Sequence, residues 1–225
     1  MIDRVGIKQT ARDLFKRSYW PCVAAYLLFG MISSLLCDGC MYFQFGPWAF
    51  ESMYMLPWAG IISFLVMPVL YVGVSYFFIR IARGDDVTIS DMFSNSFSNF
   101  GRNLGGMLWY ALWVAIWSCV FVIPGVYKAI RYSLTPYILA EYPDVSATDA
   151  LKISNRATQG HAVDILIFWL SFIGWAILSG FTFGLLELFY VGPYRSAALA
   201  ELYSQLMRMA VERGAVSPEE LGLPE

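Results

Sequence analysis

The sequence predicts an all-α fold: a polytopic membrane helical bundle of about six transmembrane helices, with amphipathic helices on the cytoplasmic side. Three observations predict it. The 225-residue chain is 58% hydrophobic and 14% charged, whereas soluble domains carry roughly 25% charged residues. Several apolar runs approach the ~20 residues that a helix needs to cross a bilayer. Polar segments that begin like amphipathic helices separate these runs.

The predicted spans are the apolar runs themselves, within a single membrane domain over residues 1–206. In chain order they lie near residues 19–37, 58–79, 105–123, 126–140, 164–181 and 183–200. The fourth is the least regular, because Pro124-Gly125 is expected to break the helix before it and Pro136 lies within it. It either crosses as a kinked helix or re-enters, and the placement of later charges favours crossing.

Amphipathic helices are predicted before alternate spans. Residues 1–18 place apolar residues on one helical face and Lys and Arg around it, which is typical of a helix in the headgroup layer with its basic side toward anionic lipid. Residues 89–104 carry an apolar stripe that includes Phe93 and Phe97. Residues 147–158 carry a stripe of small residues, which favours tight packing on other helices. Residues 207–225 are expected to form a polar cytoplasmic tail.

Two of the polar segments share one pattern. Asp-Val and a hydroxyl residue occur at 86–88 and at 144–146, and an Asp follows the hydroxyl residue by three positions in both. This spacing is typical of a capping box at a helix start. If Asp13-Leu14-Phe15 is a third and more divergent copy, three parallel repeats of one amphipathic helix and two spans give six crossings. Chance similarity over a short motif is the alternative.

The distribution of charge predicts the orientation. Lys and Arg precede the first span, lie between the second and third, and precede the fifth, whereas residues 38–57 contain neither. By the positive-inside rule, that first loop is external and both the N- and C-termini are cytoplasmic. Cys37 and Cys40 in this region have C-x-x-C spacing, and both a disulfide and two unpaired thiols stay open. The net charge of -2 and the lack of a basic stripe argue against nucleic acid as a partner.

Two longer stretches carry a resemblance to a known family. They are Phe121–Ala140, FVIPGVYKAIRYSLTPYILA, and Leu170–Leu178, LSFIGWAIL. With Gly192-Pro193-Tyr194 and the Arg83-Gly84 turn, they resemble the bacterial integral membrane proteins grouped as "domain of unknown function 975", over roughly residues 58–206. The resemblance implies a bacterial cytoplasmic-membrane protein with several helices, and it implies no particular biochemical activity.

Ionisable side chains at membrane depth are the candidate binding site, because a charge there is costly and needs a partner. They are Lys128, Arg131, Glu187, Asp164 and Arg195. We expect Glu187 to pair with Lys128 or Arg131, which lie three residues apart on one helix face. Two interpretations stay open: the charges pair and set the helix register, or they line a polar cleft for an anionic lipid, a peptide or an ion.

The sequence favours a non-enzymatic function. It contains no H-E-x-x-H, G-x-S-x-G or P-loop motif, so we predict no catalytic residues, metal ligands or cofactor. A scaffold or accessory subunit of the cytoplasmic membrane is the favoured class. The alternative is a transporter or channel-like protein for a small anionic, lipid or peptide substrate, and a lipid enzyme is the third class. Expected partners are the lipid bilayer and either another membrane protein or a second copy of the chain.

Overall fold

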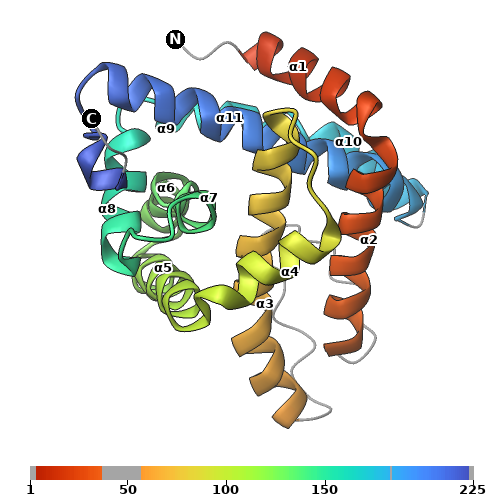
Figure 1. Ribbon diagram of the computed structural model, residues 1–225, viewed down its shortest axis with the longest axis horizontal. Helices are drawn as coiled ribbons and strands as arrows, with labels where there is room; N and C mark the ends of the chain where they lie inside the picture. Colours follow the sequence, from red (N-terminus) through yellow and green to blue (C-terminus); the bar gives the residue numbers. More distant parts are fainter. Residues whose placement is uncertain (1–3, 37–56, 183, 223–225) are drawn as a thin grey trace.

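The computed structural model describes residues 4–36, 57–182 and 184–222, and within these ranges the chain forms helices and short turns without a strand (Figure 1). The all-α prediction is therefore confirmed. In chain order the elements are α1 (Arg4–Arg17), α2 (Tyr19–Leu36), α3 (Pro57–Ala82), α4 (Ile89–Ser98), α5 (Phe100–Val120), α6 (Val122–Arg131), α7 (Thr135–Glu141), α8 (Ala147–Ala157), α9 (Ala162–Leu170), α10 (Ile173–Phe181), the π-helix η2 (Glu187–Val191), α11 (Gly192–Glu212) and the 3-10 helix η3 (Glu219–Leu221). Cys37 and Cys40 lie outside the described residues.

Four segments of the described chain are long and apolar enough to cross a membrane. They are α2, residues 60–82 of α3, α5, and residues 162–181, which α9 and α10 form together. Such segments indicate a membrane-associated protein. They correspond to the first, second, third and fifth predicted spans, whereas the fourth and sixth are built differently.

Large apolar side chains lie exposed along these four segments. They include Ile61 and Phe64 on α3, Ile116 on α5, and Ile177 and Phe181 on α10. Water-soluble proteins rarely expose large apolar surfaces, because burying such a side chain contributes roughly 1.5–3 kcal/mol. The outer surface of these helices therefore suits the hydrocarbon interior of a bilayer.

The other helices pack with one half of α3 into a compact core. α3 is largely buried from Val69 to Ile81, whereas residues 60–65 are mostly exposed. α11 lies across the C-terminal half of α3 and packs along α1, while α7 and α8 pack beside α5 (Figure 1). Tyr203 of α11 is fully buried and stacks on Tyr137 of α7. This core positions the polar groups described below.

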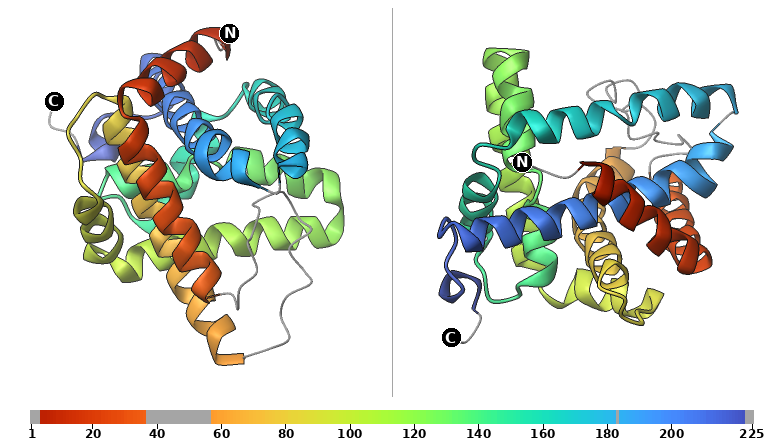
Figure 2. Two further views of the ribbon diagram at one scale, coloured as in Figure 1. Left: turned by 90° about the vertical axis from the view of Figure 1, so that its right-hand side faces the viewer. Right: turned by 90° about the horizontal axis from the view of Figure 1, so that it is seen from above.

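The long helices cross one another at steep angles. α2 and α3 lie side by side, whereas Figure 1 looks almost along α5. Figure 2 shows α6 running back beside α5, and α9 and α10 forming one long arm. The described helices therefore do not form a simple up-and-down bundle of parallel rods.

The apolar face of α1 packs on the protein itself. Ile7, Ala11 and Phe15 on that face are almost completely buried within the protein. The face packs on α11, and Phe15 makes edge-to-face contacts with Tyr19 and Tyr190. Protein side chains fill this surface because the aromatic residues of α11 and η2 complement its shape. Arg12, Lys16 and Arg17 stay on the outer side of α1.

The sequence predicted a helix break at Pro124-Gly125. In the structure the break after α5 lies at Phe121 instead. Phe121 is extended, with φ -156° and ψ 145°. Pro124 lies in the first turn of α6. Backbone N–H groups in a first turn have no acceptor within the helix, so proline, which lacks an N–H, is tolerated there. A Cβ on Gly125 would stand 2.7 Å from Ser118 Cα, so glycine is what lets α6 fold back onto α5. The predicted span 126–140 is divided by a turn into α6 and α7.

The sixth predicted span, 183–200, is also different. Its helix contains the π-helix η2 and then continues as α11 to Glu212. The polar tail expected from residue 207 therefore begins inside a helix, where Met207 and Ala210 are buried; further along, Leu221 is buried as well. Apolar residues that recur at helical spacing among polar ones extended the helix beyond the apolar run.

Both predicted helix caps are confirmed. The Thr88 hydroxyl accepts a hydrogen bond from the backbone N–H of Asp91 at the start of α4, and the Ser146 hydroxyl accepts one from Asp149 at the start of α8. The stripe predicted over 89–104 is divided, however, because Asn99 separates α4 from α5.

Candidate functional site

A buried polar cluster joins four helical segments in the half of the protein that carries α2 and α10. Glu187 of η2 is only 5% exposed. Its Oε1 lies 3.1 Å from Nη2 of Arg195 and accepts a 3.4 Å hydrogen bond from the Tyr26 hydroxyl of α2. Its Oε2 accepts a 3.5 Å hydrogen bond from the Ser179 hydroxyl of α10. We call these four residues the Glu187 cluster.

The π-helix explains why Glu187 and Arg195 meet. Eight positions separate them, which on a regular α-helix leaves two side chains well apart around the axis. The wide turn of η2 adds one residue to the helix. The effective spacing becomes two regular turns, and both side chains then project from one face. Gly192 between them also matters, because a Cβ there would overlap the Tyr26 ring.

The cluster connects α2 and α10 to the helix formed by η2 and α11. A buried carboxylate is strongly destabilising unless it has a cation and hydrogen-bond donors around it. Glu187 has one cation and two hydroxyl donors, from three other parts of the chain. The arrangement therefore satisfies the buried carboxylate and fixes the relative positions of three helices.

Lys128 and Arg131 do not reach Glu187, so the pairing predicted from the sequence is wrong. Arg131 is 8% exposed, donates a 2.8 Å hydrogen bond to Asn155 Oδ1 on α8, and lies over the Tyr127 ring. The Lys128 ammonium lies 5.4 Å from the ring centroids of both Trp117 and Tyr132. The cause is the short α6, which turns back along α5 and directs both cations toward neighbours other than η2.

Asp164 occupies a third location. Its carboxylate lies 3.5 Å from Nδ1 of His161 at the start of α9. An acidic residue in a first helical turn also interacts favourably with the positive end of the helix dipole. Of the five residues predicted from the sequence, the structure thus brings together Glu187 and Arg195.

Arg102, at the start of α5, is a structural centre that the sequence pattern did not reveal. Its guanidinium donates hydrogen bonds to three backbone carbonyls: Leu139 O at 2.6 Å, Tyr142 O at 2.6 Å and Val145 O at 2.9 Å. These carbonyls end α7 and form the turn before α8, where helical hydrogen bonds run out. The sequence did contain one signal. A cation in the first turn of a helix interacts unfavourably with the helix dipole, so its presence there indicates a stabilising contact elsewhere.

Replacing Arg102 with glutamine is expected to lower the free energy of unfolding by about 3 kcal/mol or more. Glutamine can keep one of the three hydrogen bonds, and a hydrogen bond from a charged donor contributes ~1.5–3 kcal/mol. Thermal unfolding in a mild detergent measures the loss. Lys152→Gln is the control, since that side chain is 69% exposed and an exposed ion pair contributes little. Equal melting temperatures for the two variants would contradict this role of Arg102.

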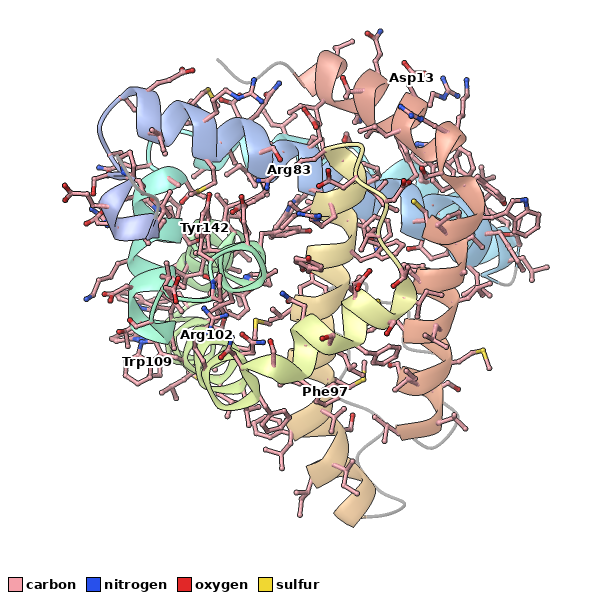
Figure 3. All side chains as sticks on the ribbon, in the orientation of Figure 1. Asp13, Arg83, Phe97, Arg102, Trp109 and Tyr142 are labelled. Carbon is pink, nitrogen blue, oxygen red and sulfur yellow. The ribbon has the colours of Figure 1, made fainter. Side chains whose placement is uncertain are left out.

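A second polar feature is a groove between the ends of α3, α7 and α11. Glu141 accepts hydrogen bonds from Arg83 and from the Tyr203 hydroxyl at its floor. The cavity has a volume of about 500 Å³, and Glu201 and Tyr142 also line it. Figure 3 labels Arg83 and Tyr142 on either side of this region. Burial raises the pKa of the Glu201 carboxyl above its usual value.

The groove brings together the two segments that share a sequence pattern. Ala82-Arg83 ends α3 and Ala140-Glu141 ends α7, each just before one of the capped helices α4 and α8. The ion pair between Arg83 and Glu141 therefore joins matching positions of the two segments. Among the described residues, no group of three His, Cys, Asp or Glu side chains is close enough to hold a metal ion.

Comparison with known proteins finds a family model that matches part of this chain. The model of the family described as "Protein of unknown function (DUF975)" matches residues 106–210. The resemblance predicted from the sequence is therefore confirmed, and the matched region runs from α5 into α11. Among curated proteins and solved structures, none matches this chain.

Proposed function

We propose that this chain is a multi-pass protein of the bacterial cytoplasmic membrane that acts as a non-enzymatic scaffold or accessory subunit. One observation carries the proposal: among the described residues, a buried carboxylate and two half-buried charged side chains are engaged within the chain. Glu187 contacts Arg195, Arg102 contacts backbone carbonyls, and Glu141 contacts Arg83 and Tyr203. A translocation path needs polar groups that exchange partners with a substrate, whereas groups paired internally hold helices in fixed positions.

A scaffold is expected to have a stable protein partner, either another membrane protein or a second copy of this chain. The groove between α3, α7 and α11 is a place where a partner segment would find both charged groups and apolar surface, since Met207 and Val211 line it together with Glu201. A partner segment with complementary charged and apolar side chains would bury the surface of this groove, and no chemical reaction would be needed there.

Mass spectrometry of complexes released directly from native membrane vesicles tests the proposed function. We expect one complex whose mass exceeds that of this chain by a fixed protein mass, at a reproducible stoichiometry. A chain released with lipid only, at concentrations where a known membrane complex in the same vesicles stays assembled, would contradict the proposal. Flux of ions or small anions through liposomes containing the purified chain would instead favour a transporter.

We also propose six crossings with both termini cytoplasmic. In this topology α6 and α7 return the chain after α5, and η2 with the first part of α11 returns it after α10. The matching caps of α4 and α8, and the Arg83–Glu141 ion pair between the segments before them, support a parallel repeat. The charge asymmetry around residues 38–57 supports the orientation.

Cysteine labelling in intact cells tests the topology, in a variant without the four native cysteines. An impermeant reagent is expected to modify a cysteine at Gly46, and to modify one at Lys152 only after the cells are opened. Lys152 is a suitable position because its side chain is exposed on α8, whereas the nearby Ser154 is fully buried and would stay unlabelled on either side. Labelling of the Lys152→Cys variant in intact cells would overturn the orientation.

A further inference from the structure

The outer face of α1 is a basic surface at the start of a candidate span. Arg12, Lys16 and Arg17 are exposed there, because the apolar face of the helix is buried on α11. Asp13, labelled in Figure 3, is exposed on the same helix. Three cations and one carboxylate leave a surplus of two positive charges (3 − 1). No carboxylate of the described residues forms an ion pair with these three cations.

Chain connectivity sets the position of this surface relative to the span. The chain passes from α1 to α2 through Ser18, whose N–H donates to Leu14 O at 3.0 Å and whose carbonyl accepts from the N–H of Cys22 at 3.2 Å; the two helices meet there at an angle (Figure 1). α2 is long and apolar enough to cross a bilayer. The basic end of α1 therefore lies where α2 enters the membrane.

Arg12 and Lys16 lie one helical turn apart near the end of α1, and Trp20 follows in the first turn of α2. Trp20 is 75% exposed although it is the second residue of an apolar helix. Tryptophan prefers the boundary between headgroups and hydrocarbon, so the cations at the end of α1 lie next to a ring suited to that boundary.

Lys8 on the same helix has a different environment. Its ammonium donates a 2.6 Å hydrogen bond to the Ser171 hydroxyl at the break between α9 and α10, and lies 5.0 Å from the Phe172 ring centroid. Burial lowers its pKa below the ordinary value. Lys8 thus holds α1 onto the protein, whereas Arg12, Lys16 and Arg17 face outward.

We propose that the surface formed by Arg12, Lys16, Arg17 and Trp20 binds the phosphate headgroup of an anionic phospholipid. The cations match the charge of such a headgroup, and cations next to a spanning helix each increase affinity for an anionic membrane surface. The exposed indole supplies the contact at the level of the glycerol and upper acyl chain. The inference rests on the proposed function only in requiring that α2 crosses the membrane.

Native mass spectrometry of the purified full chain, titrated with phosphatidylglycerol in a non-ionic detergent, tests the proposal. For the double variant Arg12→Gln, Lys16→Gln we expect the Kd for the first bound phosphatidylglycerol to rise about thirtyfold, since each cation near an anionic surface contributes roughly fivefold. Raising the salt concentration should weaken binding to the wild-type chain much more than to the variant.

The control variant carries Lys152→Gln and Arg156→Gln. These cations have the same spacing of four residues on the outer side of α8, but they pair with Asp149 and Glu220. We expect their removal to leave the Kd for phosphatidylglycerol unchanged. An equal loss in the control variant would overturn the proposal, since it would show a nonspecific effect of net charge. An unchanged Kd in the Arg12, Lys16 variant would also overturn it.

Two further comparisons define the ligand. Phosphatidylcholine with the same acyl chains is expected to bind at least tenfold more weakly, and a millimolar excess of inorganic phosphate should not displace phosphatidylglycerol. Equal binding of phosphatidylcholine would contradict recognition of an anionic headgroup, and displacement by phosphate would show that the surface binds free anion.

The cysteine labelling described above tests the membrane position of the chain separately, and the stoichiometry of native complexes tests the scaffold, so failure of either is distinguishable from failure of lipid binding.

Discussion

Replacing Gly73 with leucine is expected to prevent the chain from folding. Gly73 lies in the buried half of α3, where α4 crosses it. A Cβ at this position would overlap the Ser96 hydroxyl and stand 2.5 Å from the backbone oxygen of Met92. Met92 and Ser96 are themselves almost completely buried, so α4 cannot yield locally.

The expected cost is large because the clash involves backbone. Overpacking a tight core by extra methylene groups costs about 1–3 kcal/mol even when side chains can adjust. Here the whole of α4 would have to move away from α3, which would expose the apolar residues between them. We expect Gly73→Leu to yield little monodisperse protein in a mild detergent, and Gly73→Ala to yield folded protein with a lowered melting temperature.

Gly60 offers a matched control within the same helix. A Cβ there meets nothing within 4 Å, and the residue lies in the exposed half of α3. Gly60→Leu should therefore fold as the wild-type chain does, and the better helix propensity of leucine should help slightly. If both variants eluted as folded protein with equal melting temperatures, the close approach of α3 and α4 would be wrong.

Replacing Glu187 with glutamine is expected to lower the free energy of unfolding by about 3–5 kcal/mol, the usual cost of removing one partner from a buried ion pair. The change leaves the Arg195 guanidinium without its carboxylate in a region where Glu187 is 5% exposed. Glutamine keeps the size of the side chain, so the loss reflects charge and hydrogen bonding and not a cavity. Thermal unfolding in one detergent measures the loss.

A double-mutant cycle identifies the partner of Glu187. The effects of Glu187→Gln and Arg195→Gln should be non-additive by roughly 1–3 kcal/mol, since either change breaks the same pair. The effects of Glu187→Gln and Arg131→Gln should simply add, because Arg131 contacts Asn155. The opposite pattern would favour the pairing that the sequence suggested. Glu212→Gln, an exposed change on α11, should have little effect.

The candidate site shows where sequence-based prediction stopped. Glu187 was identified as an intramembrane charge because it interrupts an apolar run. Its partner was not identified, because the pairing with Arg195 depends on the extra residue in η2. No pattern of residues in the sequence predicts a π-helix. Arg102 was missed for a related reason: its ligands are backbone carbonyls, which every residue has.

Local residue patterns correctly predicted the helical class, the apolar segments that suit a membrane, and the caps at Thr88 and Ser146. These features depend on residues within one or two helical turns of each other, so local spacing predicts them. Contacts between distant segments set what α1 packs on, where α6 turns back, and which charges meet. Those outcomes depend on how closely distant helices approach, which is set at contacts such as Gly73 against Met92 and Gly192 against Tyr26. Such contacts join segments far apart in the chain, and the free energy that selects them is a sum over the whole packed core.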